Sequence, residues 1–261
     1  MECKDQLVST LKFLEIPKRI VCLVPSLTEL LVDLGLEENI VGVTKFCVHP
    51  THIRKEKKIV GGTKNVNFDR IQSLQPDFIL CNEEENTKEI VTKCKAISNT
   101  YVSDIYEIKD VLELIKDLGN IFNCNSNAVK ILTSLKSKLD NFNPINQKKK
   151  VAYFIWKDPW MVAANSTFIN HLLNINGFEN VYQSKERYPE VTLTELAEIK
   201  DLDFVFLSSE PYPFKETHVK LLKHSFPNSK ILIVDGEFFS WYGSRLIKAF
   251  EYFWELQKMV I

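Results

Sequence analysis

The sequence lacks any long apolar run, which excludes a membrane-spanning helix. No apolar stretch among the 261 residues approaches the roughly 18–20 residues that a bilayer crossing requires. The first residues also lack the basic start, the apolar core and the small-residue cleavage site of a signal peptide. We therefore expect a cytoplasmic protein as the sequence stands, or a periplasmic one if a leader was removed.

Glycine is scarce, and the motifs of common enzyme classes are missing. Eight glycines are few for a nucleotide-binding protein, and neither G-x-G-x-x-G nor G-x-x-x-x-G-K-[ST] occurs. The sequence also has no G-x-S-x-G nucleophile elbow and no H-E-x-x-H metalloprotease motif. A Ser–His–Asp site assembled from distant positions remains open, but no pattern selects one. These absences favour a non-enzymatic protein.

Paired cysteines and a surplus of one charge are lacking as well. None of the six cysteines forms a C-x-x-C pair, which excludes zinc-ribbon and thioredoxin-type sites. All six lie in the first half of the chain, and in the cytosol they would be free thiols. The formal net charge of −1 provides no general attraction to nucleic acid or to an anionic membrane. No nucleic-acid partner is expected.

What the sequence does have is a regular alternation of strands and helices. With 45% hydrophobic and 26% charged residues, the composition is that of an ordinary globular protein. Short apolar runs bounded by turn residues are typical of buried parallel strands. Such runs occur at Arg19–Val24, Ile40–Val43, Ile59–Val60, Asp77–Cys81, Tyr101–Val102, Val151–Trp156, Asp203–Leu207 and Ile231–Val234. Helical segments between them predict an α/β fold with parallel sheets.

Several residues mark where the intervening helices begin and end. Ser26–Glu29 and Thr192–Glu195 have the pattern of a capping box, which opens a helix. Gly119 is expected to end the helix before it. The last helix is expected to begin at Gly243.

The segment Ser126–Phe142 is predicted to form one long helix between two halves. Its apolar residues recur at the spacing of a helix face, and Asn143-Pro144 ends it. The halves echo each other in a strand, a helix and a glycine, Gly35 and Gly177. We predict two parallel-sheet α/β lobes bridged by this helix, with an extension at 1–16, lobes at 17–125 and 144–261, and the helix at 126–143. The alternative is one more crossover helix in a single sheet.

Ligands of open parallel sheets bind beyond the carboxyl ends of the strands. These ends therefore predict the binding residues without further knowledge. In the first half the candidates are Ser26, Phe46, Cys47, His49, Thr63, Lys64, Cys81 and Asn82. In the second half they are Trp156, Trp160, Tyr212, Glu237, Phe239, Trp241, Tyr242 and Arg245.

Large aromatic residues are unusually frequent in the second group. Three of the four tryptophans lie on these loops, which are normally polar because they face solvent. A broad, flat ligand is one explanation. The other is that the rings pack the loops onto the sheet or onto one another.

Cys47, His49 and Cys81 could together bind a metal or a metal chelate, because thiolates and imidazole suit zinc, copper and haem iron. The alternative is buried free thiols beside a solvated histidine. Asp235, Glu237 and Arg245 could orient polar groups of a ligand or pair with one another. No intrinsic cofactor and no protein-bound metal are predicted.

Over residues 17–257, the sequence resembles the helical-backbone metal receptors, and most closely their cobalamin-binding members. These are class III substrate-binding proteins of ABC transporters for cobalamin, iron siderophores and haem. The matching segments include Arg19–Val43, Phe46–Pro50, Gly61-Gly62, Asn67–Ile71, Leu74–Asp77, Tyr153–Trp160, Phe168–Leu173, Gly177–Val181, Tyr188–Val191 and Asp235–Arg245.

The resemblance implies a non-enzymatic protein that holds cobalamin, haem or a ferric siderophore in a cleft between two lobes. It implies that the lobes move little, because a helix joins them. It places Phe46 where a stacking Tyr occurs, Glu237 where an Asp contacts the ligand, and Thr63 where a stacking Trp occurs. The cleft lining would include Trp156, Trp160, Trp241 and Tyr242.

The resemblance also implies an ABC permease as partner. Family members present one Glu per lobe to arginines of the permease. In this sequence Asp69 takes the first place, and Thr194 takes the second with Glu195 beside it. Asp69 and Glu195 are therefore the candidate docking residues of a protein expected to be monomeric.

Two other functions stay open. One is a cytoplasmic enzyme or handling protein that acts on a corrinoid or similar cofactor, with Cys47, Cys81 and His49 as reactive groups, since fold does not fix function. The other is an interaction protein whose own Trp and Phe side chains fill the cleft.

Overall fold

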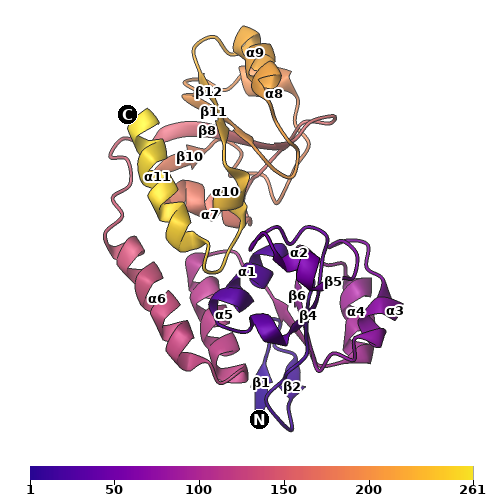
Figure 1. The fold of residues 1–261 in the computed structure, drawn as a ribbon. Coiled ribbons are helices and arrows are strands. Elements are labelled where there is room, and N and C mark those ends of the chain that lie inside the picture. Colours follow the sequence, from indigo (N-terminus) through magenta and orange to yellow (C-terminus); the bar gives the residue numbers. More distant parts are fainter. Residues whose placement is uncertain (261) are drawn as a thin grey trace. The chain divides into compact units, whose positions relative to one another are not determined.

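The computed structural model describes residues 1–260, which form two compact units (Figure 1). Unit 1 comprises Met1–Ser137 together with Tyr242–Arg245, and unit 2 comprises Lys138–Trp241 together with the chain from Leu246 onward. Each unit has its own parallel sheet, so the predicted α/β fold is confirmed and the single-sheet alternative is wrong. The predicted domain boundaries stay predictions.

The sheet of unit 1 has five parallel strands. Their bounds are β3 Ile20–Cys22, β4 Ile40–Val43, β5 Lys58–Ile59, β6 Phe78–Asn82 and β7 Thr100–Ser103. They pair in the order β5-β4-β3-β6-β7, with β3 at the centre. Both β3 and β6 are buried along their whole length, as expected for strands whose two faces are covered. The sequence reasoning missed the antiparallel hairpin of β1 Glu2–Lys4 and β2 Thr10–Lys12, because its strands have only three residues each.

The helices of unit 1 follow the strands in the predicted alternation. Their bounds are α1 Pro25–Asp33, the 3₁₀-helix η1 Glu37–Asn39, α2 Ile53–Glu56, α3 Phe68–Ser73, α4 Lys88–Ile97, α5 Ile108–Ile121 and α6 Asn125–Asp140. The capping box predicted at Ser26–Glu29 does not form. Pro25 occupies the first turn of α1 instead, where its missing N–H has no cost, and the side chain of Val24 offers no cap.

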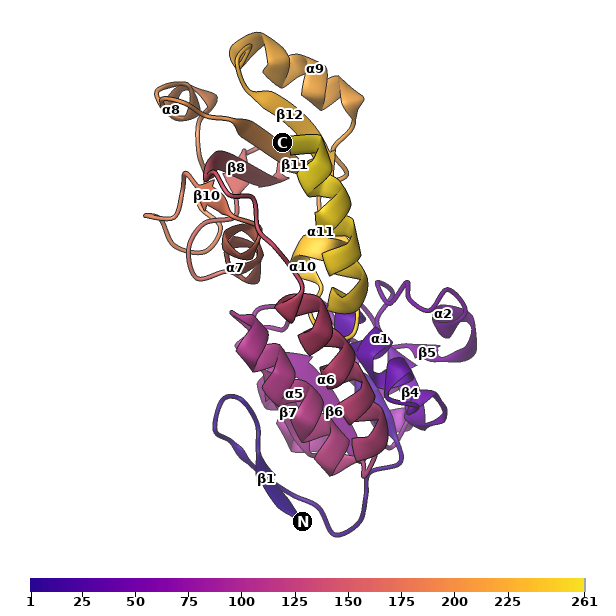
Figure 2. The same ribbon diagram turned by 90° about the vertical axis from the view of Figure 1, so that its left-hand side faces the viewer.

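Helix α6 confirms the predicted long helix, and α5 continues past Gly119. Both ribbon views show α5 and α6 side by side (Figures 1 and 2). A Cβ atom on Gly119 would lie 2.7 Å from the Cβ of Ala128 in α6. The prediction that Gly119 ends α5 is therefore wrong, because this glycine allows the two helices to pack closely.

Unit 2 has a second parallel sheet with one short antiparallel strand. Its strands are β8 Lys149–Trp156, β9 Met161–Val162, β10 Phe178–Asn180, β11 Phe204–Ser208 and β12 Lys230–Val234. The parallel strands pair in the order β10-β8-β11-β12, and β9 pairs with β8. The helices are α7 Phe168–Ile175, α8 Leu193–Ala197, α9 Glu216–Ser225, α10 Gly236–Ser240 and α11 Leu246–Val260.

Helix α8 has the predicted cap, whereas α11 begins three residues later than predicted. The side chains and backbone of Thr192 and Glu195 cap each other at the start of α8. Before α11, the chain leaves unit 2 after Trp241, contributes four residues to unit 1 and returns to unit 2 at Leu246. Gly243 therefore lies in a connection rather than in a helix.

Among residues 1–260, no helix is both long enough and apolar enough to cross a membrane.

Candidate functional site

The loop after β4 presents an exposed aromatic ring and a cation. Phe46 is 49% exposed, which is unusual for a phenylalanine. The Lys45 ammonium lies 4.9 Å from the centre of this ring, within the range of a cation–π contact. Phe46 and Lys45 together therefore offer a flat apolar face and a positive charge to a ligand.

The Cys47 and Cys81 thiols lie in the core of unit 1. Cys47 is buried, and its Sγ lies 3.1 Å from the Thr28 hydroxyl and 3.3 Å from the Thr44 hydroxyl. Burial raises the pKa of the Cys47 thiol. A hydrogen bond with Cys94, together with burial, raises the pKa of the Cys81 thiol well above its usual value. Both groups are therefore protonated thiols, which are weak nucleophiles and weak metal ligands.

The structure does not bring Cys47, His49 and Cys81 together as metal ligands. In the part of the chain that the structure describes, the donor atoms of these three side chains do not all lie within 4.8 Å of one another. Of the two readings of these residues, the geometry favours the buried free thiols.

Asn82, at the end of β6, shapes the turn that follows. Its amide nitrogen donates to the Ser103 carbonyl at 3.0 Å, and its side-chain oxygen accepts the backbone N–H groups of Glu84 and Glu85 at 2.9 and 3.0 Å. Asn86 closes the same turn by donating to the Thr63 carbonyl at 3.0 Å. The Lys64 ammonium donates to the Glu84 carbonyl. Asn82 thus holds an acidic turn in place beside Thr63 and Lys64.

Replacing Glu85 by Gln should make the stability of the chain less dependent on pH. Burial and the neighbouring Glu84 raise the pKa of the Glu85 carboxyl. The protonated carboxyl is favoured in the folded state, so its stabilising contribution is fully present below the unfolded-state pKa and is lost as the pH rises through the raised folded-state pKa. Chemical denaturation from about pH 4 upward should show a shallower decline for Glu85→Gln than for the unsubstituted protein. Glu83→Gln, at an exposed position of the same turn, is the control; parallel curves for all three proteins would contradict the prediction.

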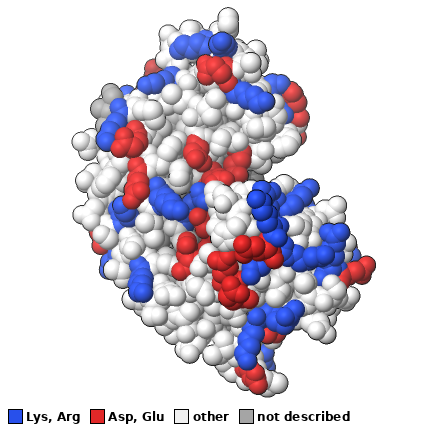
Figure 3. Space-filling view, viewed as in Figure 1, with Lys and Arg blue, Asp and Glu red and all other residues white. Residues whose placement is uncertain are grey.

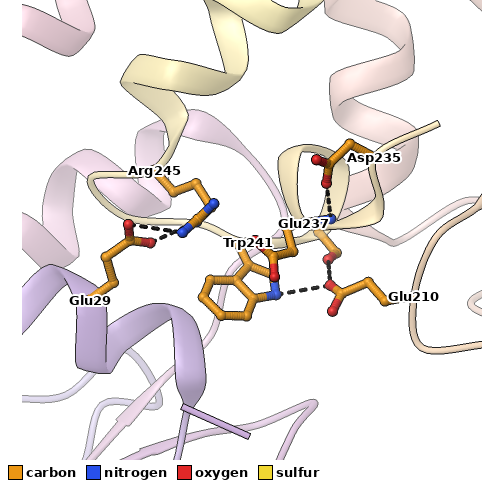
Figure 4. A network of polar contacts seen from close by, with 7 residues as sticks. Glu29, Glu210, Asp235, Glu237, Trp241 and Arg245 are labelled. Carbon is orange, nitrogen blue, oxygen red and sulfur yellow. Dashed lines mark hydrogen bonds and ion pairs between the residues drawn. The ribbon is translucent and has the colours of Figure 1, made fainter. Parts of the chain in front are cut away.

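The segment Tyr242–Arg245 is anchored in unit 1 by a buried ion pair. The Arg245 guanidinium donates from Nε and Nη2 to the two carboxylate oxygens of Glu29 at 2.7 and 3.0 Å (Figure 4). The side chains of Arg245 and Glu29 are only 7% and 9% exposed. Arg245 was predicted to bind a ligand, and the structure directs its guanidinium to Glu29. Tyr242 and Ser26 are also buried in unit 1.

In unit 2, the end of β8 and the loops after β8 and β11 carry a continuous cluster of rings. Trp156 is 39% exposed and meets Tyr212 edge-on at 5.5 Å between ring centres. Tyr212 lies 4.7 Å from Phe214, which stacks on Trp160 at 6.0 Å. The rings pack on one another, yet Trp156 keeps an exposed face.

A second group of polar contacts in unit 2 surrounds Glu210. One of its carboxylate oxygens accepts the Ser240 hydroxyl and the Trp241 indole N–H, both at 2.9 Å (Figure 4). The Asp235 carboxylate accepts the backbone N–H of Glu237 at 3.0 Å and so caps α10. Arg245 pairs with Glu29, and the predicted cluster of Asp235, Glu237 and Arg245 stays a prediction.

Phe239 lies in the core of unit 2. It is fully buried, and its ring centre lies 4.8 Å from that of Phe253 and 5.2 Å from that of Tyr153. Its contacts are those of a core residue rather than of a ligand-binding one.

The two candidate docking residues differ in their surroundings. Asp69 is exposed in the first turn of α3, which Asn67 caps. Glu195 accepts the Thr192 backbone N–H at 2.8 Å. This hydrogen bond, with the nearby Lys185, lowers the pKa of the Glu195 carboxyl. Glu195 thus serves its own helix, although it is exposed.

Basic side chains gather over the part of unit 1 that carries α2 and β5 (Figure 3). The segment that contributes them includes Arg54, Lys55, Lys57 and Lys58. The net charge of the whole chain does not reveal this local surplus.

Sequence reasoning missed Lys45 and Glu29 as members of these sites. Lys45 directly precedes Phe46, so an aromatic–cation pair in the loop could have been found by inspection. Glu29 and Arg245 are 216 residues apart, and no local pattern indicates such a contact.

Comparisons with known proteins identify a family. The model of the family described as "Periplasmic binding protein" matches residues 20–223. An uncharacterized ABC transporter substrate-binding lipoprotein, YvrC of Bacillus subtilis, is 28% identical over 187 residues, which are 67% of this chain and 59% of that protein. The vitamin B12-binding protein of Photorhabdus laumondii is 23% identical over 243 residues, covering 90% of this chain and 86% of that protein.

Solved structures show the same fold. The vitamin B12-binding protein BtuF of Vibrio cholerae has a TM-score of 0.72 at 18% identity, with 94% of this chain and 98% of that chain covered. The heme-binding protein BhuT, solved with two hemes, has a TM-score of 0.79 at 20% identity, with 94% and 99% covered. Since the family model spans well over half of the residues, the chain belongs to the periplasmic binding protein family, whose members are non-enzymatic solute-binding proteins.

Proposed function

We propose that the chain is the substrate-binding component of an ABC transporter and that it binds a metal chelate of the cobalamin, haem or ferric siderophore class. The observation that carries the proposal is the pair of exposed aromatic side chains at strand ends: Phe46 lies in the loop after β4, and Trp156 is the last residue of β8. Ligands of parallel sheets bind at such strand ends. The names of the relatives, which include vitamin B12-binding and heme-binding proteins, support the same class of ligand.

The chemistry of these side chains suits recognition rather than turnover. Phe46 and Trp156 offer ring faces to a broad, flat ligand, and polar groups such as Lys45, Lys64 and Glu237 would orient it. The buried thiols of Cys47 and Cys81 are poorly suited to attack a ligand. This weighs against an enzyme that uses them on a corrinoid or similar cofactor.

The ligand can be identified by titration of the purified protein. Cyanocobalamin, haemin and a panel of ferric siderophores are added separately, and absorbance and tryptophan fluorescence are followed. We expect saturable quenching by one of them at a stoichiometry of one or two chelates per chain. No response to any of the three classes would overturn the proposal, and chemically altered chelate recovered after incubation would favour the enzyme instead.

Replacing Trp156 or Phe46 by Ala should weaken binding of the responding chelate. Base- or ring-stacking contacts of this kind contribute about 1–3 kcal/mol each, and we expect a loss of affinity of about 10–100-fold for each variant. Trp254, a tryptophan of α11 that is 43% exposed, supplies the control, and Trp254→Ala should bind as the unsubstituted protein does. If only one of Trp156→Ala and Phe46→Ala loses affinity for the chelate, only the ring replaced in that variant contacts it. If all three variants bind the chelate with equal affinity, neither Phe46 nor Trp156 belongs to the binding site.

We further propose that the protein works outside the cytoplasmic membrane and docks on its permease through Asp69. The relatives named periplasmic or lipoprotein support this location over the cytoplasm. Asp69 is preferred to Glu195 because the Glu195 carboxylate accepts the backbone N–H and the hydroxyl of Thr192. In cells whose uptake depends on this protein, Asp69→Ala should reduce uptake while chelate affinity in vitro is unchanged; undiminished uptake would contradict the docking role.

A further inference from the structure

Two carboxylates and one imidazole meet on unit 1 at positions apart from the candidate ligand residues. Glu37 lies in η1, directly before β4. His52 precedes the first residue of α2 and Glu56 is its last, so both come before β5. One donor atom from each side chain lies within 4.8 Å of the other two. Across residues 1–260, this is the one group of three or more His, Cys, Asp or Glu side chains so arranged.

The cluster is not an ordinary patch of acids neutralised by neighbouring lysines. His52 and Glu56 are four residues apart on a helical turn and so face the same side. His52 Nε2 lies 2.5 Å from a carboxylate oxygen of Glu37. Although the segment around Glu56 is rich in Lys and Arg (Figure 3), the Arg54 guanidinium donates to the Lys45 carbonyl at 3.1 Å instead. The Glu37 carboxylate is hydrogen-bonded to the His52 imidazole, so a metal ion would take the place of the proton between these two groups, with Glu56 as its third ligand.

We propose that Glu37, His52 and Glu56 bind a divalent transition-metal ion, for which Zn²⁺ is the best match. Imidazole nitrogen and carboxylate oxygen are both zinc ligands, and three protein ligands leave one position for water. The donor set lacks a thiolate, which would favour Cu(I), and it has a nitrogen, which disfavours Mg²⁺ and Ca²⁺. The side chains of His52 and Glu37 are 44% and 30% exposed, so the ion would exchange with solvent.

The position of the site suggests what the ion does. The site joins η1, which precedes β4, to α2, which ends the loop after β4. This loop carries Phe46, Cys47 and His49. A bound ion would fasten the loop at its far end and reduce the motion of Phe46. This consequence rests on the proposed function, whereas the metal site itself does not.

Calorimetric titration of the full chain with zinc chloride tests the site, after removal of metal by a chelator and with a thiol-free reductant. We expect one Zn²⁺ ion per chain. His52→Ala should bind Zn²⁺ about 10–100-fold more weakly, because even residues that only support a metal ligand contribute that much to metal affinity. Glu56→Gln should also weaken Zn²⁺ binding. His224→Ala removes an exposed histidine of α9 in unit 2 that lies outside the cluster, and it should bind zinc as the unsubstituted protein does.

Cobalt(II) distinguishes this site from zinc bound by the cysteines. Co²⁺ at the proposed site should give weak d–d absorption without the intense near-ultraviolet band of a thiolate–cobalt bond. Three results would overturn the proposal. They are the appearance of that thiolate band, zinc affinity that is unchanged in both His52→Ala and Glu56→Gln, and the absence of any zinc binding. Thermal melts of the variants confirm that they are folded. Because no chelate is present, failure of this experiment leaves the chelate-binding proposal untouched.

Discussion

Replacing Arg245 by Met should lower the free energy of unfolding by about 3–5 kcal/mol, the usual cost of removing one partner from a buried ion pair. The substitution takes away both hydrogen bonds, at 2.7 and 3.0 Å, that the guanidinium donates to Glu29. The Glu29 carboxylate would then lose the counter-charge of Arg245 while it remains buried, where a charge is poorly solvated. Urea denaturation followed by circular dichroism measures the change. The same loss should release Tyr242–Arg245 from unit 1, because this pair anchors the segment.

Two further variants distinguish the cost of leaving a charge buried without its partner from the cost of losing any ion pair. Lys138 and Glu251 form an exposed pair of the same 2.7 Å length, and Lys138→Met should cost at most about 1 kcal/mol. The double substitution Glu29→Met/Arg245→Met removes both charges and should recover much of the stability lost in Arg245→Met. If Arg245→Met costs no more than Lys138→Met, the buried pair does not anchor the segment.

Replacing Gly236 by Ala should cost about 3 kcal/mol, at the upper end of the range for an overpacked site. A Cβ atom at this position would overlap the Ser208 hydroxyl oxygen, and it would lie 2.7 Å from Cγ of Glu210 and 3.0 Å from the Glu210 backbone nitrogen. The backbone atom cannot move without disturbing the end of β11. We also expect the contact between Glu210 and the Trp241 indole to be lost, which near-ultraviolet circular dichroism would report.

Gly62→Ala is the matched control for this substitution. A Cβ atom on Gly62 would lie 3.1 Å from Cε2 of Phe46 and 3.5 Å from Cε of Lys45. Both are ends of side chains at exposed positions, which can give way, so the cost should stay below about 1 kcal/mol. Adding Ser208→Ala to Gly236→Ala should relieve the shortest contact and restore part of the stability. Equal stability of Gly236→Ala and Gly62→Ala would show that the loop at Glu210 yields without cost.

Elements set by local patterns were predictable from the sequence. The strand β4 has the predicted bounds, Ile40–Val43, and the cap of α8 at Thr192 and Glu195 forms as the pattern indicates. In both cases the information lies within a few consecutive residues, through apolar run length or through a side chain that reaches its own helix terminus. Short elements escaped, because the three-residue strands of the β1–β2 hairpin have too few positions to show a period.

Errors arose where a local signal competes with packing. Gly119 has the appearance of a helix end, yet α5 continues because the glycine is needed against Ala128 of another helix. Ser26–Glu29 fits a capping box, yet Pro25 starts α1 and Glu29 is taken by Arg245. The sequence contains the residues of both arrangements, and only the partner from elsewhere in the chain decides between them.

The strand ends that carry the candidate site followed from the sequence alone, because parallel strands place their carboxyl ends at one edge. The absence of enzyme motifs and the family resemblance likewise come from the residues themselves. Which of the named side chains are available was decided by the tertiary structure: Phe46 and Trp156 are exposed, Cys47 and Phe239 lie in the core, and Arg245 pairs with Glu29. The physical reason is that burial and charge pairing depend on neighbours far away in the sequence, whereas strand and helix patterns depend on neighbours within a few residues.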